Sequence, residues 1–362
     1  MTRPTLRRPA RKDTLMTARP VARRGFFLGA GSLLATGALA ACSSEPEAPL
    51  APPKGPEPAE HTPVNTHEQF ETCVSEVNAA VVAADKKMDA KKLAPRVSGS
   101  AADFRKAAYA MIEEAEEWKD FLTTPSDTLI VPMTTVSAEF PRVAIALVED
   151  SAKEGVPFFM ALQQADAKSP YSAWGWAQQA AGIEMPSVPN ELVGSEAVAA
   201  DADDLLLTPD KALALYAKVL SDGKDADADD LLGEDPFMTE RHKQIQTERT
   251  ELNTGVEKDE AATVKETYAV KEEEFAGLRT DDGGAIVMGT LLSSRTVSIK
   301  DRATMRYGED NPYTKVIGKR EFTKEYIRKF GTHVALYIPS KDAGGTIQPI
   351  AATLTTLGAE GS

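Results

Sequence analysis

Cysteine is scarce in this 362-residue sequence, which contains only Cys42 and Cys73. Two cysteines exclude a multi-bridge disulfide framework and a Cys-based zinc site. The sequence also contains no Gly-x-Ser-x-Gly nucleophile elbow and, in its mature part, no phosphate-cradling glycine loop. These absences predict a non-catalytic protein without a cofactor. An enzyme whose site is assembled from scattered pocket residues stays open as the alternative.

Histidine is nearly as rare, with four residues in the whole chain: His61, His67, His242 and His333. Their spacing contains no pair that would bind a metal from one element. His67 stands at an expected helix start and His333 in an expected strand. Structural or solvent-facing roles are therefore predicted for all four, and no metal site is expected.

An acidic segment is the nearest approach to a calcium motif. Ala226–Leu232 repeats Ala200–Leu206 residue for residue, and carboxylates recur from Asp225 onward. An EF-hand loop starting there would need a turn glycine and a closing glutamate, but Asp230 and Pro236 occupy those positions. The segment is therefore interpreted as solvated acids at a loop or helix start.

Basic charge is in deficit, since the chain carries a formal charge of −14. Residues 1–41 hold eight basic residues and one acidic one, so the remainder has 33 basic and 54 acidic residues, a charge of −21. This balance argues against nucleic acid as a partner and against unaided adhesion to anionic lipid. The stretch Lys315–Lys329 is an exception to this acidic balance, because it is basic. We expect a half-solvated hairpin there, with contact to an anionic envelope polymer as the alternative.

No hydrophobic run is long enough to span a bilayer comfortably. The longest, Gly25–Ala41, follows the pair Arg23-Arg24 and ends in Leu39-Ala40-Ala41-Cys42. A cysteine directly after small residues and a short apolar run is typical of a bacterial lipobox. The pattern predicts that residues 1–41 are a removed signal peptide. Lipidated Cys42 would then hold the protein at the outer face of the cytoplasmic membrane.

Two features of this signal leave alternatives open. An ordinary secretory peptide with an incidental cysteine, or an uncleaved anchor helix, would also contain such a run. Phe26 fits a twin-arginine export signal, although Ala22 stands where a polar residue is usual, so the general secretory route remains the alternative. The true start is either Met1 or Met16.

Composition divides the mature chain into segments. Residues 42–64 are rich in proline and poor in apolar side chains, which predicts a disordered tether. Residues 65–195 and 208–360 are expected to form two α+β domains, joined by an acidic connector over residues 196–207.

Periodicity within the first domain predicts helices followed by strands. A helix from about Thr66 carries a three- and four-residue apolar repeat through Val81, which includes Cys73 as a small packed residue rather than a reactive thiol. A second helix surrounds Phe104 to Ala115. Beyond Pro125 the period becomes two, over residues 128–136, 143–147 and 158–162.

The same order recurs in the second domain. Thr208 and Pro209 predict a capped helix start, and further helical sequence surrounds residues 237–245. Strands are expected over residues 263–270, 274–279, 285–299, 321–330, 332–338 and 347–357. A turn at residues 281–284 joins the second of these to the third. The fold class predicted is therefore α+β, with two tandem units of helices packed on a curved antiparallel sheet.

Trp174 and Trp176 form the most distinctive aromatic pair. Their spacing on a strand predicts the same side-chain direction. Buried together they would anchor the sheet core, and exposed together they would form a stacking platform for a glycan or a partner.

The element order resembles the nuclear-transport-factor-2-like, or cystatin-like, cone. Pro170–Ala177, followed by Gly182–Pro186, together with the lipobox and the double unit, resembles a group of actinobacterial lipoproteins built around a domain of unassigned function. That resemblance supplies no catalytic residues. It supports the location and the fold and leaves the activity open. The function predicted is a non-catalytic, lipid-anchored envelope protein whose two domains bind a partner or an apolar or glycan ligand. A carrier of a lipid or hydrophobic molecule, and an enzyme with an unrecognised pocket site, remain the alternatives.

Overall fold

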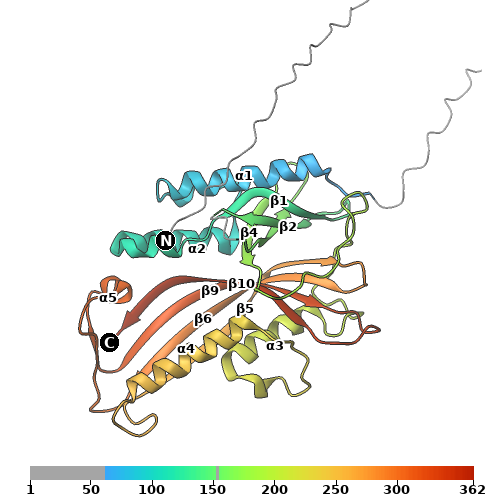
Figure 1. The fold of residues 1–362 in the computed structure, drawn as a ribbon. Coiled ribbons are helices and arrows are strands. Elements are labelled where there is room, and N and C mark those ends of the chain that lie inside the picture. Colours follow the sequence, from blue (N-terminus) through green and yellow to red (C-terminus); the bar gives the residue numbers. More distant parts are fainter. Residues whose placement is uncertain (1–61, 152–154) are drawn as a thin grey trace, which may run out of the picture. The chain divides into compact units, whose positions relative to one another are not determined.

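The computed structural model describes residues 62–151 and 155–362, which belong to one compact unit. It contains two four-stranded antiparallel sheets with helices against them, which confirms the α+β class (Figure 1). The expected signal peptide, lipobox, His61 and most of the tether lie outside the described residues. Within those residues, no helix is both long and apolar enough to cross a membrane.

The first half has the element order that the sequence predicts. Thr66 caps the first helix through a reciprocal capping box with Gln69, at the expected start. The strands form a meander in the order β1-β2-β3-β4. The elements are α1 (His67–Asp85), η1 (Ala90–Lys92), α2 (Gly99–Glu114), η2 (Glu116–Phe121), β1 (Pro125–Thr134), β2 (Arg142–Asp150), β3 (Phe158–Gln164) and β4 (Ser172–Gln178).

The second half repeats this order with an insertion. Its sheet is the meander β5-β6-β9-β10, and a small unit is inserted between β6 and β9. The elements are α3 (Pro209–Asp222), η3 (Lys224–Ala226), α4 (Pro236–Leu252), β5 (Ala262–Arg279), β6 (Ala285–Ile299), β7 (Met305–Arg306), α5 (Pro312–Ile317), β8 (Glu321–Phe322), β9 (Glu325–Ile338) and β10 (Gln348–Gly361).

Several local expectations for this half were wrong. The strands expected to end at Val270 and begin at Glu274 are one strand, β5, whose register shifts between Val270 and Phe275. The basic stretch is not a hairpin. It begins in the last turn of the short helix α5, and β8 and β9 pair with other strands rather than with each other. Thr208 stands at the cap position of α3, but its hydroxyl donates to Asp210 rather than accepting a backbone amide.

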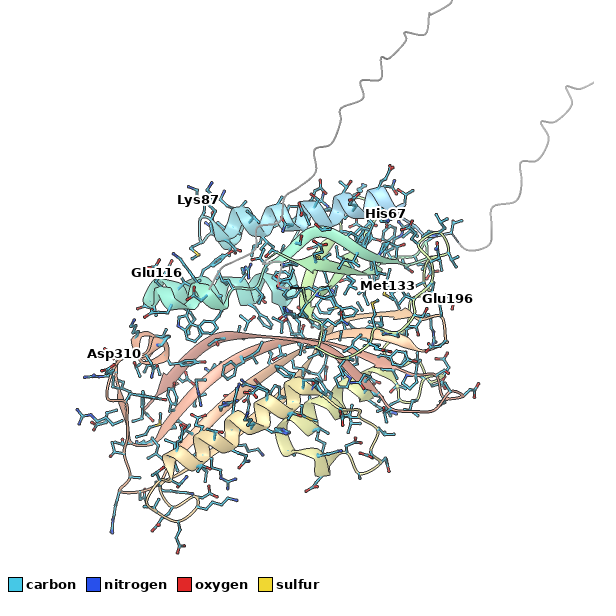
Figure 2. All side chains as sticks on the ribbon, in the orientation of Figure 1. His67, Lys87, Glu116, Met133, Glu196 and Asp310 are labelled. Carbon is cyan, nitrogen blue, oxygen red and sulfur yellow. The ribbon has the colours of Figure 1, made fainter. Side chains whose placement is uncertain are left out.

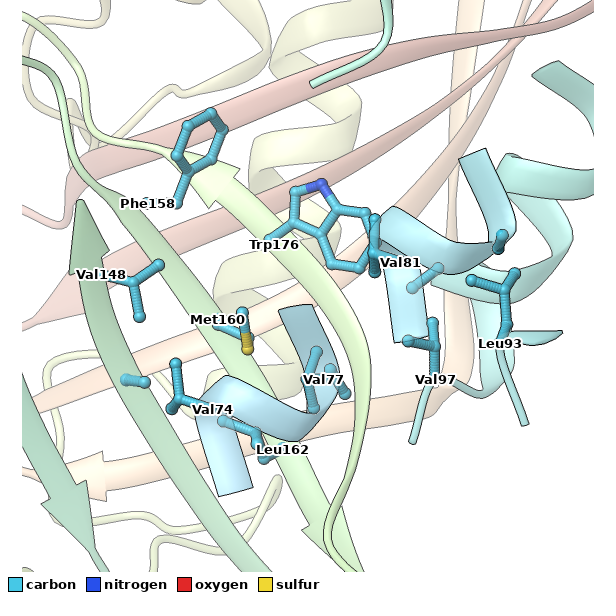
Figure 3. Close-up of a cluster of buried hydrophobic side chains, with 14 of the residues drawn as sticks. Val74, Val77, Val81, Leu93, Val97, Val148, Phe158, Met160, Leu162 and Trp176 are labelled. Atoms are coloured by element: carbon cyan, nitrogen blue, oxygen red, sulfur yellow. The ribbon is translucent and has the colours of Figure 1, made fainter. Parts of the chain in front are cut away.

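The two sheets pack face to face. Ile145 and Phe159 from the first sheet meet Ile286, Met288 and Ala335 from the second in one buried cluster. Helix α1 covers the outer face of the first sheet, where Val74, Val77 and Val81 pack on Met160 and Leu162 (Figure 3). Helices α3 and α4 cover the outer face of the second sheet. The two halves share this core. The expected division into domains at residues 65–195 and 208–360 stays a prediction.

The strands of the second sheet are longer than those of the first, and helix α2 of the first half packs on both sheets. The strands of the second sheet have 14 to 18 residues and those of the first have seven to 10. Helix α2 packs on β10 as well as on β4. Gly331 of β9 permits this approach, since a Cβ there would collide with the ring of Phe104.

Candidate functional site

A partly open cavity lies where α2 and η2 cross the long strands of the second sheet. Its volume is about 170 Å³. Figure 2 labels Glu116, beside α2, and Asp310, beside α5, at this same end of the unit. The lining is mostly apolar and aromatic, and consists of Ala101, Phe104, Arg105, Ala108, Met111, Trp118, Phe121, Leu122, Thr123, Trp176, Tyr313, His333, Leu354, Thr355 and Thr356.

Aromatic rings hold the cavity walls in place. Phe104 stacks on the imidazole of His333, with ring centroids 4.9 Å apart. Trp118 packs edge-on against Tyr313 at 4.8 Å and beside Phe121 at 5.4 Å. Phe121 is 67% exposed, so one wall ring also faces solvent. Rings in such geometry are rigid and offer an apolar ligand a preformed surface.

Arg105 carries the only permanent charge among the described residues of the lining, and this charge is already neutralised. Its Nε and Nη2 donate to the carboxylate of Asp85 at 2.9 and 2.7 Å, and Tyr109 donates to the same carboxylate at 2.6 Å. Burial, and then this hydrogen bond, raise the pKa of Tyr109. The guanidinium lies 5.6 Å from the ring of Trp176. A ligand in this cavity therefore does not need a negative charge.

A buried polar cluster lies behind His333 and joins the two halves. Glu274 of β5 accepts hydrogen bonds from the Ser100 amide at 2.6 Å, from Thr290 Oγ1 at 2.7 Å and from Lys271 Nζ at 2.7 Å. It also contacts the hydroxyl of Ser100, which lies 3.0 Å from His333 Nε2. Burial raises the pKa of Glu274, but these hydrogen bonds outweigh it and leave the pKa below its usual value.

This cluster brings a serine and a histidine together, but the polarity of their hydrogen bond is not that of a catalytic Ser-His pair. The Trp176 amide donates to His333 Nδ1 at 3.4 Å, so the neutral ring carries its proton on Nε2 and donates it to Ser100. Burial lowers the pKa of His333 to about 4, which keeps the ring neutral at pH 7. Glu274 contacts the serine and not the histidine. A Ser-His nucleophile pair needs the opposite polarity, in which the histidine accepts the proton of the serine.

The two tryptophans do not share a side-chain direction, contrary to the sequence prediction. Ala161 pairs with Gly175 and Leu162 with Ala173, so Trp174 is an extra residue in a β-bulge. The bulge places Trp174 in the core between the sheets and Trp176 in the core under α1. Both rings are at least 96% buried, so they form no exposed platform. Trp176 alone lines the cavity.

The other sequence candidates lie apart from the cavity. His67 pairs with Glu191 at 2.6 Å, and His242 Nε2 lies 3.1 Å from the Leu220 carbonyl. Cys73 is partly buried against the first core, and burial raises the pKa of its thiol. Asp227 accepts the amides of residues 231 and 232 and so serves its loop. Across residues 62–151 and 155–362, no group of three His, Cys, Asp or Glu could hold a metal ion.

Sequence reasoning missed Ser100, Glu274 and Thr290. One signal was present, since an apolar run in each of two strands is interrupted by a glycine followed by polar residues, at residues 289–290 and 331–333. These two segments lie side by side in the sheet, because Thr290 pairs with His333. Polar side chains buried in an apolar strand need partners, which here come from α2 and β5.

The comparison with protein families identifies the family to which this chain belongs. A domain of unknown function, DUF8094, matches residues 61–358. The chain belongs to this family. The match covers both sheets and the cavity between α2 and β10, so the family unit includes both halves. No curated protein and no solved structure matches the chain.

Proposed function

We propose that this protein is a lipid-anchored binding protein of the bacterial cell envelope that takes a small apolar group into the cavity beside His333. The aromatic cavity carries the proposal. Its polar lining groups Arg105 and His333 have partners within the protein, so they need no catalytic role. The protein gains stability when an apolar group fills a mostly apolar cavity of this kind.

The size of the cavity defines the ligand class. Pockets that enclose drug-sized ligands have about 300–1,000 Å³, whereas engineered apolar cavities of about 150 Å³ bind benzene. A cavity of about 170 Å³ thus suits one aromatic ring or a short alkyl chain. This small volume favours a protein that binds one ring or one chain end of a larger molecule. It argues against a carrier that encloses a whole lipid.

The location in this proposal rests on the lipobox. Leu39-Ala40-Ala41-Cys42 supports an anchor at the outer face of the cytoplasmic membrane, after export by the twin-arginine or the general secretory route. The doubled helix-then-meander order supports kinship with actinobacterial lipoproteins of the nuclear-transport-factor-2-like or cystatin-like type. A protein, glycan or hydrophobic molecule of the envelope is the partner, and the acidic mature chain argues against nucleic acid.

Filling the cavity should abolish ligand binding. Ala108→Leu places a larger side chain in the lining, while Ala110→Leu adds the same side chain at an exposed position on the same helix. Native mass spectrometry of the protein purified gently from its own host should show a bound small molecule in the wild type and in Ala110→Leu. Ala108→Leu should show the apo mass. Equal occupancy in both variants, or an apo wild type, would contradict the proposal.

Cys42→Ser should release the protein from the membrane. Cells fed an alkynyl fatty acid should label the wild type, and the labelled protein should sediment with membranes. The matched control is Cys73→Ser, which removes the other cysteine and should retain both label and location. If the Cys42→Ser protein were still labelled, lipid attachment at Cys42 would be contradicted. The proposal of ligand binding in the cavity would be unaffected.

A further inference from the structure

A row of charged side chains crosses the second sheet on the face opposite the cavity. Glu266 of β5 pairs with Arg295 of β6, and Arg295 pairs with Arg328 of β9. The next position in the row is Ala359 of β10. All three charged side chains lie on the sheet face that α4 covers, and α4 contributes Arg241 and Glu248.

The charges in this layer do not balance. Arg241 Nη2 donates to both carboxylate oxygens of Glu266 at 2.7 Å, and Arg295 Nε donates to the same group at 2.7 Å. Arg328 Nη2 donates to Glu248 at 2.5 and 2.6 Å, and Arg295 Nη1 lies 3.6 Å from Glu248. Among the described residues, three guanidinium groups thus share two carboxylates, which leaves one uncompensated positive charge in this layer.

The arrangement of the arginines makes this excess costly. Arg295 and Arg328 are directly opposite each other on neighbouring strands, where like charges destabilise a sheet. Arg295 is only 4% exposed, so water screens its charge poorly. Ala359, at the end of the row, offers no counter-charge.

Arg295 and Arg328 each also have one N–H group without a hydrogen-bond partner among the described residues. These groups are Arg295 Nη2 and Arg328 Nε, and both are buried. Both side chains line a groove of about 680 Å³ between α4 and the β7 segment. On the groove rim, Lys243 and Arg306 balance Glu240 and Glu251, so the excess charge belongs to the floor. A group that satisfies these donors must accept hydrogen bonds and carry negative charge.

We propose that this groove binds an oxyanion group, a phosphate or a carboxylate, on Arg295 and Arg328. Residues 295–329 contain ten basic and five acidic residues, whereas the chain as a whole is strongly acidic. Three of these basic residues, Arg295, Arg306 and Arg328, line the groove. The site is separate from the cavity beside His333 and does not rest on the function proposed for that cavity.

Isothermal titration calorimetry with inorganic phosphate and, separately, with acetate tests this site and distinguishes the two sources of the oxyanion. Sodium chloride at matched ionic strength controls for screening. We expect saturable binding of one or both probes to the full chain. Arg328→Gln removes a floor donor and should weaken binding at least about tenfold. Arg306→Gln changes only the exposed rim and should weaken binding less.

Two controls keep the test decisive. Lys211→Gln makes the same charge change on α3, outside the groove, and should bind like the wild type. Arg306→Gln lies at an exposed position, so it reports on the groove even if Arg328→Gln fails to fold. Absence of saturable heat with both probes would overturn the proposal, as would equal loss of binding in Lys211→Gln and Arg306→Gln.

Discussion

Replacing Glu274 with Ala should destabilise the protein by about 3–5 kcal/mol, the range seen when one partner of a buried ionic contact is removed. The Glu274 side chain is 9% exposed and accepts from Lys271, Thr290 and the amide and hydroxyl of Ser100. Without the carboxylate, the buried Ser100 amide on α2 loses its acceptor, and the hydroxyls of Ser100 and of Thr290 on β6 lose their charged partner. Because α2 belongs to the first half and β5 to the second, the loss weakens the junction between them.

Urea unfolding followed by circular dichroism measures this effect, and Glu273→Ala is the matched control. Glu273 precedes Glu274 in the chain and is exposed, so its replacement should change the free energy of unfolding by less than about 0.5 kcal/mol. Similar losses in the two variants would show that Glu274 does not hold the junction together.

Acidification should destabilise the protein through His333. Burial lowers the pKa of this imidazole in the folded protein to about 4, against 6.5 for the free side chain. The unfolded chain therefore binds a proton between these values and the folded protein does not, so stability falls as the pH falls through this window. The difference corresponds to about 3 kcal/mol lost between neutral pH and about pH 4.

Free energies of unfolding from urea titrations across this pH window measure the loss, with His333→Gln as the comparison. Glutamine can still donate to Ser100 but does not titrate. Carboxylates with lowered pKa values, such as Glu274, lose stabilisation at acid pH in both proteins. The difference between the two pH profiles therefore reports on His333. Parallel profiles would show that His333 is accessible to protons in the folded state.

Hydrophobic periodicity was sufficient to predict most of the elements. The repeat from Phe70 to Val81 and the capping pair at Thr66 locate α1, and the two-residue period after Pro125 locates the first sheet. These signals are local, because a helix or strand face is defined by neighbours a few residues away. The errors arose where local sequence admits two structures. Trp174 and Trp176 have strand spacing, but a bulge at Trp174 turns them into different cores.

The candidate sites could not be predicted in the same way. Ser100, Glu274 and His333 are far apart in the chain, and each has an ordinary local explanation as a helix-start serine, a strand acid or a strand histidine. The same holds for Glu266, Arg295 and Arg328, whose charges follow no motif. Strand register alone makes them neighbours.

The sequence by itself determined the element order, the doubled α+β plan, the acidic balance of the mature chain and the prediction of a lipid anchor at Cys42. These depend on composition and on spacings of two to four residues. Only the tertiary structure decided that the two sheets share a core, that α2 encloses a cavity over β9 and β10, and that three arginines share two carboxylates under α4. The physical reason is that packing and charge pairing depend on contacts between distant segments, which local pattern does not encode.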